Sequence, residues 1–162
     1  MNTKLIALAA AVAAGGASAA TTQTDRAFVE KAAIANAGEI AVGRLAATHS
    51  QDANVKAFGE RMVNDHTKAA EALEAAAKKD GIELPPAPAG NPDAERLARL
   101  NGVEFDRAFG DRMRADHAKA VALFSEESKA SGDSHVKAFA AKTLPTLEDH
   151  KKLAQSLPGA AK

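Results

Sequence analysis

The chain has 162 residues with 21 basic and 21 acidic side chains, and it contains no cysteine, tryptophan or tyrosine. The balanced charge and the lack of stacking aromatic residues argue against a nucleic-acid-binding protein. The lack of cysteine excludes disulfides, thiolate metal sites, Cys-x-x-Cys-His haem attachment and a lipid-anchored N-terminus. The sequence therefore predicts neither a haem protein nor a lipoprotein.

Residues 1–19 contain, in the usual order, the three regions of a secretory signal peptide. Lys4 gives the positive start, residues 5–14 are apolar, and Ala17-Ser18-Ala19 is a small-x-small cleavage motif. The apolar run is shorter than the roughly 20 residues that span a bilayer, and no later segment is apolar enough. We expect cleavage near Ala19 and a periplasmic or secreted protein without a transmembrane segment.

Residues 20–162 carry no signal for β-strands, because no run alternates with period two and β-branched and aromatic residues are sparse. Alanine, glutamate, lysine and leucine are abundant instead. We expect an all-α domain, an antiparallel four-helix bundle. Its predicted helices cover about 25–48, 52–80, 92–130 and 133–157, with a linker at 81–91.

The predicted boundaries follow capping chemistry. Thr24, Asp52 and Asp133 can accept hydrogen bonds from the first free N–H groups of three helices. Asn91 followed by Pro92 is a typical start for the remaining helix. Gly81 can end the second predicted helix because glycine adopts the left-handed backbone conformation readily.

Two short motifs occur twice in the same order. Asp-Arg-Ala-Phe stands at 25–28 and 106–109, and Val-Lys-Ala-Phe stands at 55–58 and 136–139. The pattern indicates an internal duplication and two tandem helical hairpins. The linker is long enough either to cross the length of the bundle or to form a loop, and the duplication favours the crossover. Pro145 predicts a kink in the last helix.

A third motif, Asp-His-x-Lys, occurs three times in a chain with only five histidines. Helical spacing places His66, His117 and His150 on the apolar stripe of the second, third and fourth predicted helices. The stripe of the first helix carries Glu39 instead, with Asn36 one turn away. Counted from the helix ends, the three histidines share one level of the bundle to within about 5 Å.

Two interpretations of this polar layer stay open. Glu39, His66, His117 and His150 suit one zinc, copper, iron or nickel ion, with Asn36 supporting the ligands from outside. The alternative is a hydrogen-bonded layer of buried polar groups. Met62 and Met113 each precede a core histidine by four residues and are weaker candidates for copper ligands, since methionine at this spacing usually fills the core.

The sequence resembles a family of bacterial exported proteins, domain-of-unknown-function family 4142. The resemblance rests on the segments ANAGEIAVGRLA, VKAFGERMVNDHTKA, EFDRAFGDRMRADHAKAVALF and VKAFAAKTLPTLEDH. It implies a ferritin-like four-helix bundle of unassigned function. Ferritin-like di-iron sites use Glu-x-x-His, whereas Val63, Arg114 and Leu147 stand three residues before the histidines here. We therefore do not expect a di-iron centre.

Two classes of function fit these observations. The first is metal binding for storage, buffering or sensing, and the second is a structural or stress-related interaction protein with a buried Glu/His layer. An enzyme is disfavoured because the chain has no nucleophile elbow, phosphate loop or Ser-His-Asp pattern. A site with four protein ligands also leaves no open position for a substrate. The sequence does not determine the metal, the partner or the oligomeric state.

Overall fold

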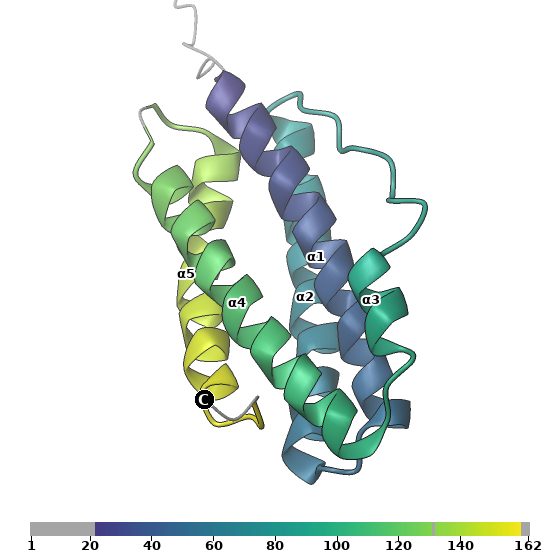
Figure 1. The fold of residues 1–162 in the computed structure, drawn as a ribbon. Helices are drawn as coiled ribbons and strands as arrows, with labels where there is room; N and C mark the ends of the chain where they lie inside the picture. The colour runs from purple at the N-terminus through teal and green to yellow at the C-terminus, as the bar shows by residue number, and fades with distance from the viewer. Residues whose placement is uncertain (1–21, 131, 160–162) are drawn as a thin grey trace, which may run out of the picture.

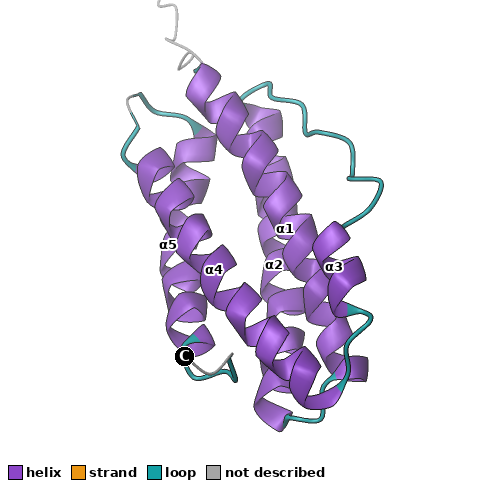
Figure 2. Ribbon diagram, viewed as in Figure 1, coloured by secondary structure: helices purple, strands orange, loops and turns teal. Residues whose placement is uncertain are grey.

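The computed structural model describes residues 22–130 and 132–159, so the expected signal peptide at 1–19 lies outside the described residues. Within those residues the chain is helical and has no strand (Figure 2), which confirms the all-α prediction. None of the described helices is long and apolar enough to cross a membrane. The helices are α1 (Gln23–His49), α2 (Ala53–Lys79), α3 (Pro92–Leu97), α4 (Gly102–Ser128) and α5 (His135–Ala154).

Two helices begin at residues next to those expected. Thr22, not Thr24, caps α1, and it forms a reciprocal capping box with Asp25. Ser134, not Asp133, caps α5 by accepting from the backbone of Lys137. Side-chain oxygens of either neighbour suit a cap, so the sequence locates such a boundary only to within two residues. The expected roles of Asp52, Asn91 and Gly81 are confirmed.

The single helix expected over 92–130 is wrong, because the structure divides it into α3 and α4. The break covers residues 98–101, and Gly102, the first residue of α4, has a φ of +52°. Only glycine adopts this conformation without steric cost, and it cannot continue a right-handed helix. The turn lets Leu97 of α3 reach the core, where it is fully buried. α5, in contrast, runs as one helix through Pro145.

The four long helices form two hairpins that pack side by side. α1 pairs with α2, and α4 pairs with α5, while α1 also contacts α4 and α2 contacts α5. Between the hairpins, the segment 80–91 returns along the outside of the bundle, so α4 runs in the same direction as α2 (Figure 1). The structure therefore has the crossover that the duplication favours, and its topology is that of a ferritin-like bundle.

The core consists of two hydrophobic clusters, one toward each end of the bundle. The upper cluster joins the start of α1 to the end of α4 and includes Phe28 and Phe124. The lower cluster joins the end of α1 to the start of α4 and includes Phe105 and Phe109. Buried polar side chains lie between the clusters, and the most important are Glu39, His66, His117 and His150.

α1 and α2 approach closely at a pair of glycines. A Cβ atom added to Gly59 would lie 2.4 Å from the Cβ of Ala46 and 2.7 Å from the carbonyl oxygen of Gly43. Backbone atoms cannot move aside as a flexible side chain can. The contact therefore fixes the spacing of the first hairpin beside the polar layer.

We predict that Gly59→Ala destabilises the fold by about 1–3 kcal/mol, although alanine favours helices more than glycine does. Thermal and urea unfolding, followed by circular dichroism, measure the change. Gly38→Ala in α1 is the control, since its Cβ would meet only the side chain of Asn91, at 3.2 Å. Equal stability of the two variants would contradict the close contact.

Candidate metal centre

Three helices bring three histidines to one point in the core. His66 of α2, His117 of α4 and His150 of α5 each place one ring nitrogen within 4.8 Å of the others. Their ring centroids are 5.4–5.9 Å apart. None of the three is more than 6% exposed. The shared level that helical spacing predicts for these histidines is thus present in the structure.

Asn36 of α1 orients the ring of His66 through two hydrogen bonds. Its amide nitrogen donates to the carbonyl oxygen of His66 at 2.7 Å, so its amide oxygen is free to accept. The Nδ1 of His66 lies 2.7 Å from that oxygen and must therefore carry the proton. This leaves a lone pair on Nε2, which is buried and has no partner among the described residues.

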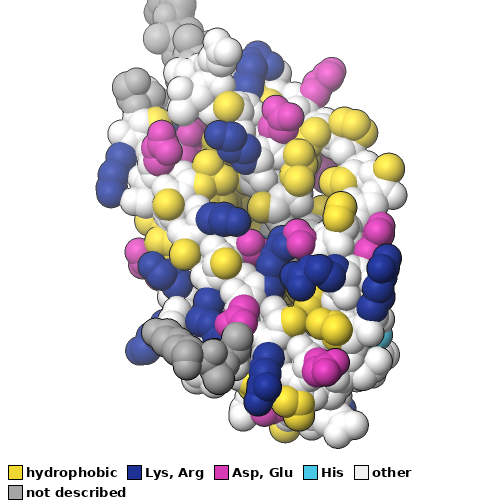
Figure 3. Space-filling model, in the orientation of Figure 1, with side chains coloured by type: hydrophobic (Ala, Val, Ile, Leu, Met, Phe, Trp, Pro, Cys, Tyr) yellow, Lys and Arg dark blue, Asp and Glu magenta, His cyan; other side chains and the backbone are white. Residues whose placement is uncertain are grey.

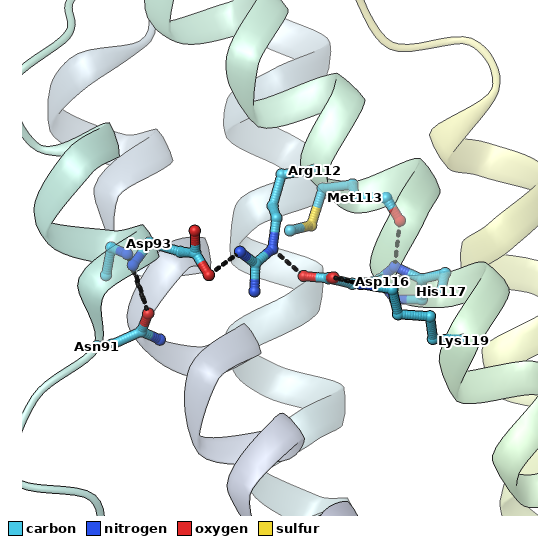
Figure 4. Close-up of polar contacts among 8 residues, drawn as sticks. Asn91, Asp93, Arg112, Met113, Asp116, His117 and Lys119 are labelled. Atoms are coloured by element: carbon cyan, nitrogen blue, oxygen red, sulfur yellow. Dashed lines mark hydrogen bonds and ion pairs between the residues drawn. The ribbon is translucent and has the colours of Figure 1, made fainter.

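The other two histidines are held in the same manner. Nδ1 of His117 donates to the carbonyl oxygen of Met113 at 2.9 Å (Figure 4). Nε2 of His150 donates to Asp65 of α2 at 3.0 Å. The remaining nitrogens, Nε2 of His117 and Nδ1 of His150, are buried without a partner within the described chain. All three histidines therefore combine one fixed N–H with one unpaired lone pair.

Burial keeps the three imidazoles neutral. Burial, together with charge repulsion from the neighbouring His117 and His150, lowers the pKa of His66 to about 3. It lowers the pKa of His117 to about 4 against the opposing effect of the Met113 carbonyl group. The pKa of His150 is also lowered by burial, although Asp65 opposes the shift. Neutral imidazole is the form that binds metal ions.

Glu39, the fourth expected ligand, lies outside the group of histidines. It is 8% exposed, and its pKa is raised to about 8 by burial and by the charge of Asp116, while Arg112 opposes the shift. Arg112 pairs with both Asp93 and Asp116 (Figure 4). The structure thus joins three of the four expected side chains and places Glu39 in an adjacent carboxyl network.

The two methionines considered as weaker ligands are part of the lower hydrophobic cluster. Met62 and Met113 are fully buried there. Met113 serves the site through its backbone carbonyl oxygen, which accepts from His117. The spacing of four residues suggested a sulphur ligand. In the structure, the same spacing instead brings the backbone carbonyl group of Met113 to the ring of His117.

Sequence reasoning missed the function of the aspartate in the repeated Asp-His motif. The aspartate and lysine of each motif lie three residues apart on a helix, yet among the described residues only Asp116 and Lys119 form such an ion pair, at 3.9 Å. Asp65 instead reaches across to His150, and Asp149 reaches Arg61 of α2 at 2.5 Å. These contacts link the two hairpins, so helical periodicity alone could not reveal them.

The duplication explains why the site has three histidines and an asparagine. When the two Asp-Arg-Ala-Phe motifs are superposed, Asn36 of α1 stands at the position of His117 of α4. α1 thus contributes a hydrogen-bonding partner where α4 contributes a ring nitrogen. His66 and His150 do not superpose in this way, because His150 stands one helical turn further along its repeat.

The fold and the buried cluster define a ferritin-like four-helix bundle with three converging histidines. The chain belongs to the family described as "Domain of unknown function (DUF4142)", whose model matches residues 10–157. The structure is similar to the crystal structure of a DUF305 fragment from Deinococcus radiodurans, with a TM-score of 0.69 and 17% identity over 83% of this chain and 94% of that chain. At this identity the likeness concerns the fold alone. None of the curated proteins compared matches the chain.

We predict that replacing a buried histidine removes part of the acid sensitivity of the metal-free protein. The pKa of His117 in the folded chain is about 4, below the ordinary 6.5, so folding releases a proton between these values and stability falls as the pH falls through them. His117→Leu should gain roughly 3 kcal/mol over wild type between pH 6.5 and 4. Urea unfolding at several pH values measures the difference, and a constant difference would contradict a buried neutral histidine.

Proposed function

We propose that this protein binds one transition-metal ion through His66, His117 and His150. The observation that supports this is the meeting of three buried lone pairs that have no hydrogen-bond donor among the residues the structure describes. A buried polar atom without a partner costs about 1–3 kcal/mol. One cation would satisfy all three nitrogens at once, because each can donate its lone pair to the same ion.

The partners of the opposite ring nitrogens also support metal binding. Asn36, the Met113 carbonyl group and Asp65 each hold one N–H and thereby fix the tautomer and the ring orientation. Histidines that bind metals usually donate their second ring nitrogen to a carboxylate or carbonyl oxygen in this way. The ligands are therefore oriented before the ion arrives, which lowers the entropic cost of binding.

The ligand set narrows the choice of metal. Three imidazoles suit zinc, copper, iron or nickel, and they do not suit magnesium or calcium, which prefer oxygen. Glu39 would complete a four-coordinate site by giving up its proton and turning toward the ion. Its negative charge would then offset part of the charge of a divalent cation in the core.

A role in metal storage, buffering or sensing outside the cytoplasm follows from this proposal and from the signal-like residues 1–19. The described part of the chain offers one such cluster, which fits buffering or sensing better than bulk storage. The second candidate is a structural or stress-related interaction protein whose polar layer holds no metal. The neutral state of the histidines favours this second candidate, because an uncharged imidazole needs no counter-ion in the core.

We expect about one metal ion per chain in protein purified from its native compartment without an affinity tag or chelator. Elemental mass spectrometry should show that His117→Ala and His66→Ala lose the ion while circular dichroism shows an intact helical fold. His135→Ala is the control, because His135 is 58% exposed and lies outside the cluster. Absence of metal from wild-type protein, also after dialysis against zinc, would favour the second candidate.

We also predict that Glu39 makes metal binding depend on pH near neutrality. The pKa of Glu39 is raised to about 8, so a metal ion that uses this carboxylate must displace a proton below that pH. Zinc affinity should therefore rise as the pH increases from 6.5 to 8, by about tenfold at most per pH unit. Calorimetric titration of Glu39→Gln should give weaker binding with a flatter pH profile, and an unchanged profile would remove Glu39 from the ligand set.

A further inference from the structure

A cavity of about 770 Å³ opens beside the histidine cluster. It lies between α1, the segment 87–93 and α4, and its inner wall includes His66 and His117. In the face of the molecule that Figure 3 shows, hydrophobic side chains are visible between α1 and α4, with charged side chains around them. The volume falls within the range of about 300–1,000 Å³ that is usual for sites of small organic ligands.

Most of the wall is apolar. Leu73, Phe124, Phe139 and Leu147 of the upper cluster form its deep part, and small residues such as Ala120 leave the space open. A hydrocarbon or aromatic group placed there would gain roughly 25 cal/mol for each Å² of apolar surface removed from water. The walls thus favour a ligand with an apolar body.

Of the charged lining residues, Arg112, Asp93, Asp116 and Lys119 have ionic partners, whereas Lys31 is exposed to solvent. Arg112 pairs with Asp93 and Asp116, and Lys119 lies 3.9 Å from Asp116. A charged group placed against the apolar deep wall would lose its hydration without gaining a counter-charge there, so the deep part of the cavity favours an uncharged molecule.

The unpaired polar atoms in the wall are acceptors. Nε2 of His66 and Nε2 of His117 carry lone pairs, since the other nitrogen of each ring donates its proton elsewhere. Oε2 of Glu39 is also buried without a partner among the described residues. These atoms are fully buried, so the wall must shift slightly before the O–H or N–H group of a ligand satisfies one of them in the metal-free protein.

We propose that this cavity binds a small uncharged molecule with an aromatic or hydrocarbon body and one hydrogen-bond donor. The body lies against Leu73, Phe124 and Phe139, and the donor faces Glu39 and His66. Such a ligand occupies the bundle beside the histidines rather than a site on its surface. This inference does not depend on a metal ion, so it is tested on metal-free protein kept in chelator.

The first experiment uses N-phenyl-1-naphthylamine, an uncharged aromatic probe with one N–H group whose fluorescence increases in apolar surroundings. We expect saturable binding of one probe per chain. Its sulphonated analogue, 1-anilinonaphthalene-8-sulphonate, should bind at least about tenfold more weakly because its charge has no partner inside. Equal binding of the two probes, or no saturable binding of the first, would overturn the proposal.

The second experiment tests the location with a matched pair of variants. Ala120→Leu fills the cavity from α4 and should weaken probe binding about tenfold, because the added carbons occupy the ligand's space. Ala118→Leu makes the same change on the exposed side of α4 and should bind like wild type. If Ala120→Leu does not fold by circular dichroism, Ala69→Leu fills the same cavity from α2. Wild-type affinity in the folded filling variant would exclude this cavity.

The third experiment tests the donor by competition. 1-Naphthol and 1-methoxynaphthalene share one ring system, but only the first has an O–H group. 1-Naphthol should displace the probe at a concentration several-fold lower, in keeping with about 1 kcal/mol for one buried hydrogen bond. Equal displacement by the two compounds would show that the acceptors in the wall do not select the ligand.

Discussion

The structure depends on three buried imidazole rings whose orientation is set by partners on other helices or one turn away. Asn36 of α1 holds His66 of α2, and Asp65 of α2 holds His150 of α5. These contacts cross the first hairpin and the boundary between the hairpins. Buried hydrogen bonds in a medium of low dielectric constant are strong when they are satisfied and costly when they are broken. The polar layer therefore fixes the register of three helices while leaving three lone pairs to be satisfied.

The two hydrophobic clusters exclude water from this layer at its two ends along the bundle. Phe58 lies edge-on to both His117 and His150, with ring centroids 6.0 and 6.4 Å away, and closes the lower side of the site. Exclusion of water is the cause of the low pKa values of the histidines and of the raised pKa of Glu39. The same environment thus provides neutral nitrogen ligands and retains a proton on the nearest carboxyl group. In the proposed metal site the neutral nitrogens would bind without losing a proton, and Glu39 alone would exchange its proton for the ion.

Duplication produced a near-symmetric bundle with an asymmetric centre. The crossover makes the two hairpins run antiparallel to each other. The equivalent helices therefore lie side by side, α1 beside α4 and α2 beside α5 (Figure 1). Asn36 replaces the equivalent of His117, and small side chains on α1 and α4 leave the adjacent cavity. The side of the bundle that lacks a fourth histidine is therefore the side from which a small molecule can reach the cluster.

The sequence by itself determined the helical class, the two hairpins and the burial of His66, His117 and His150, because periodicity and capping are local properties of a helix. Only the tertiary structure decided what surrounds these rings. The separation of Glu39 from the histidines, the bond from Asp65 to His150 and the cavity beside His117 depend on side-chain directions and on the distances between helices. The break before Gly102 had a local signal in Asn101-Gly102, but the burial of Leu97 that accompanies it requires the packed bundle.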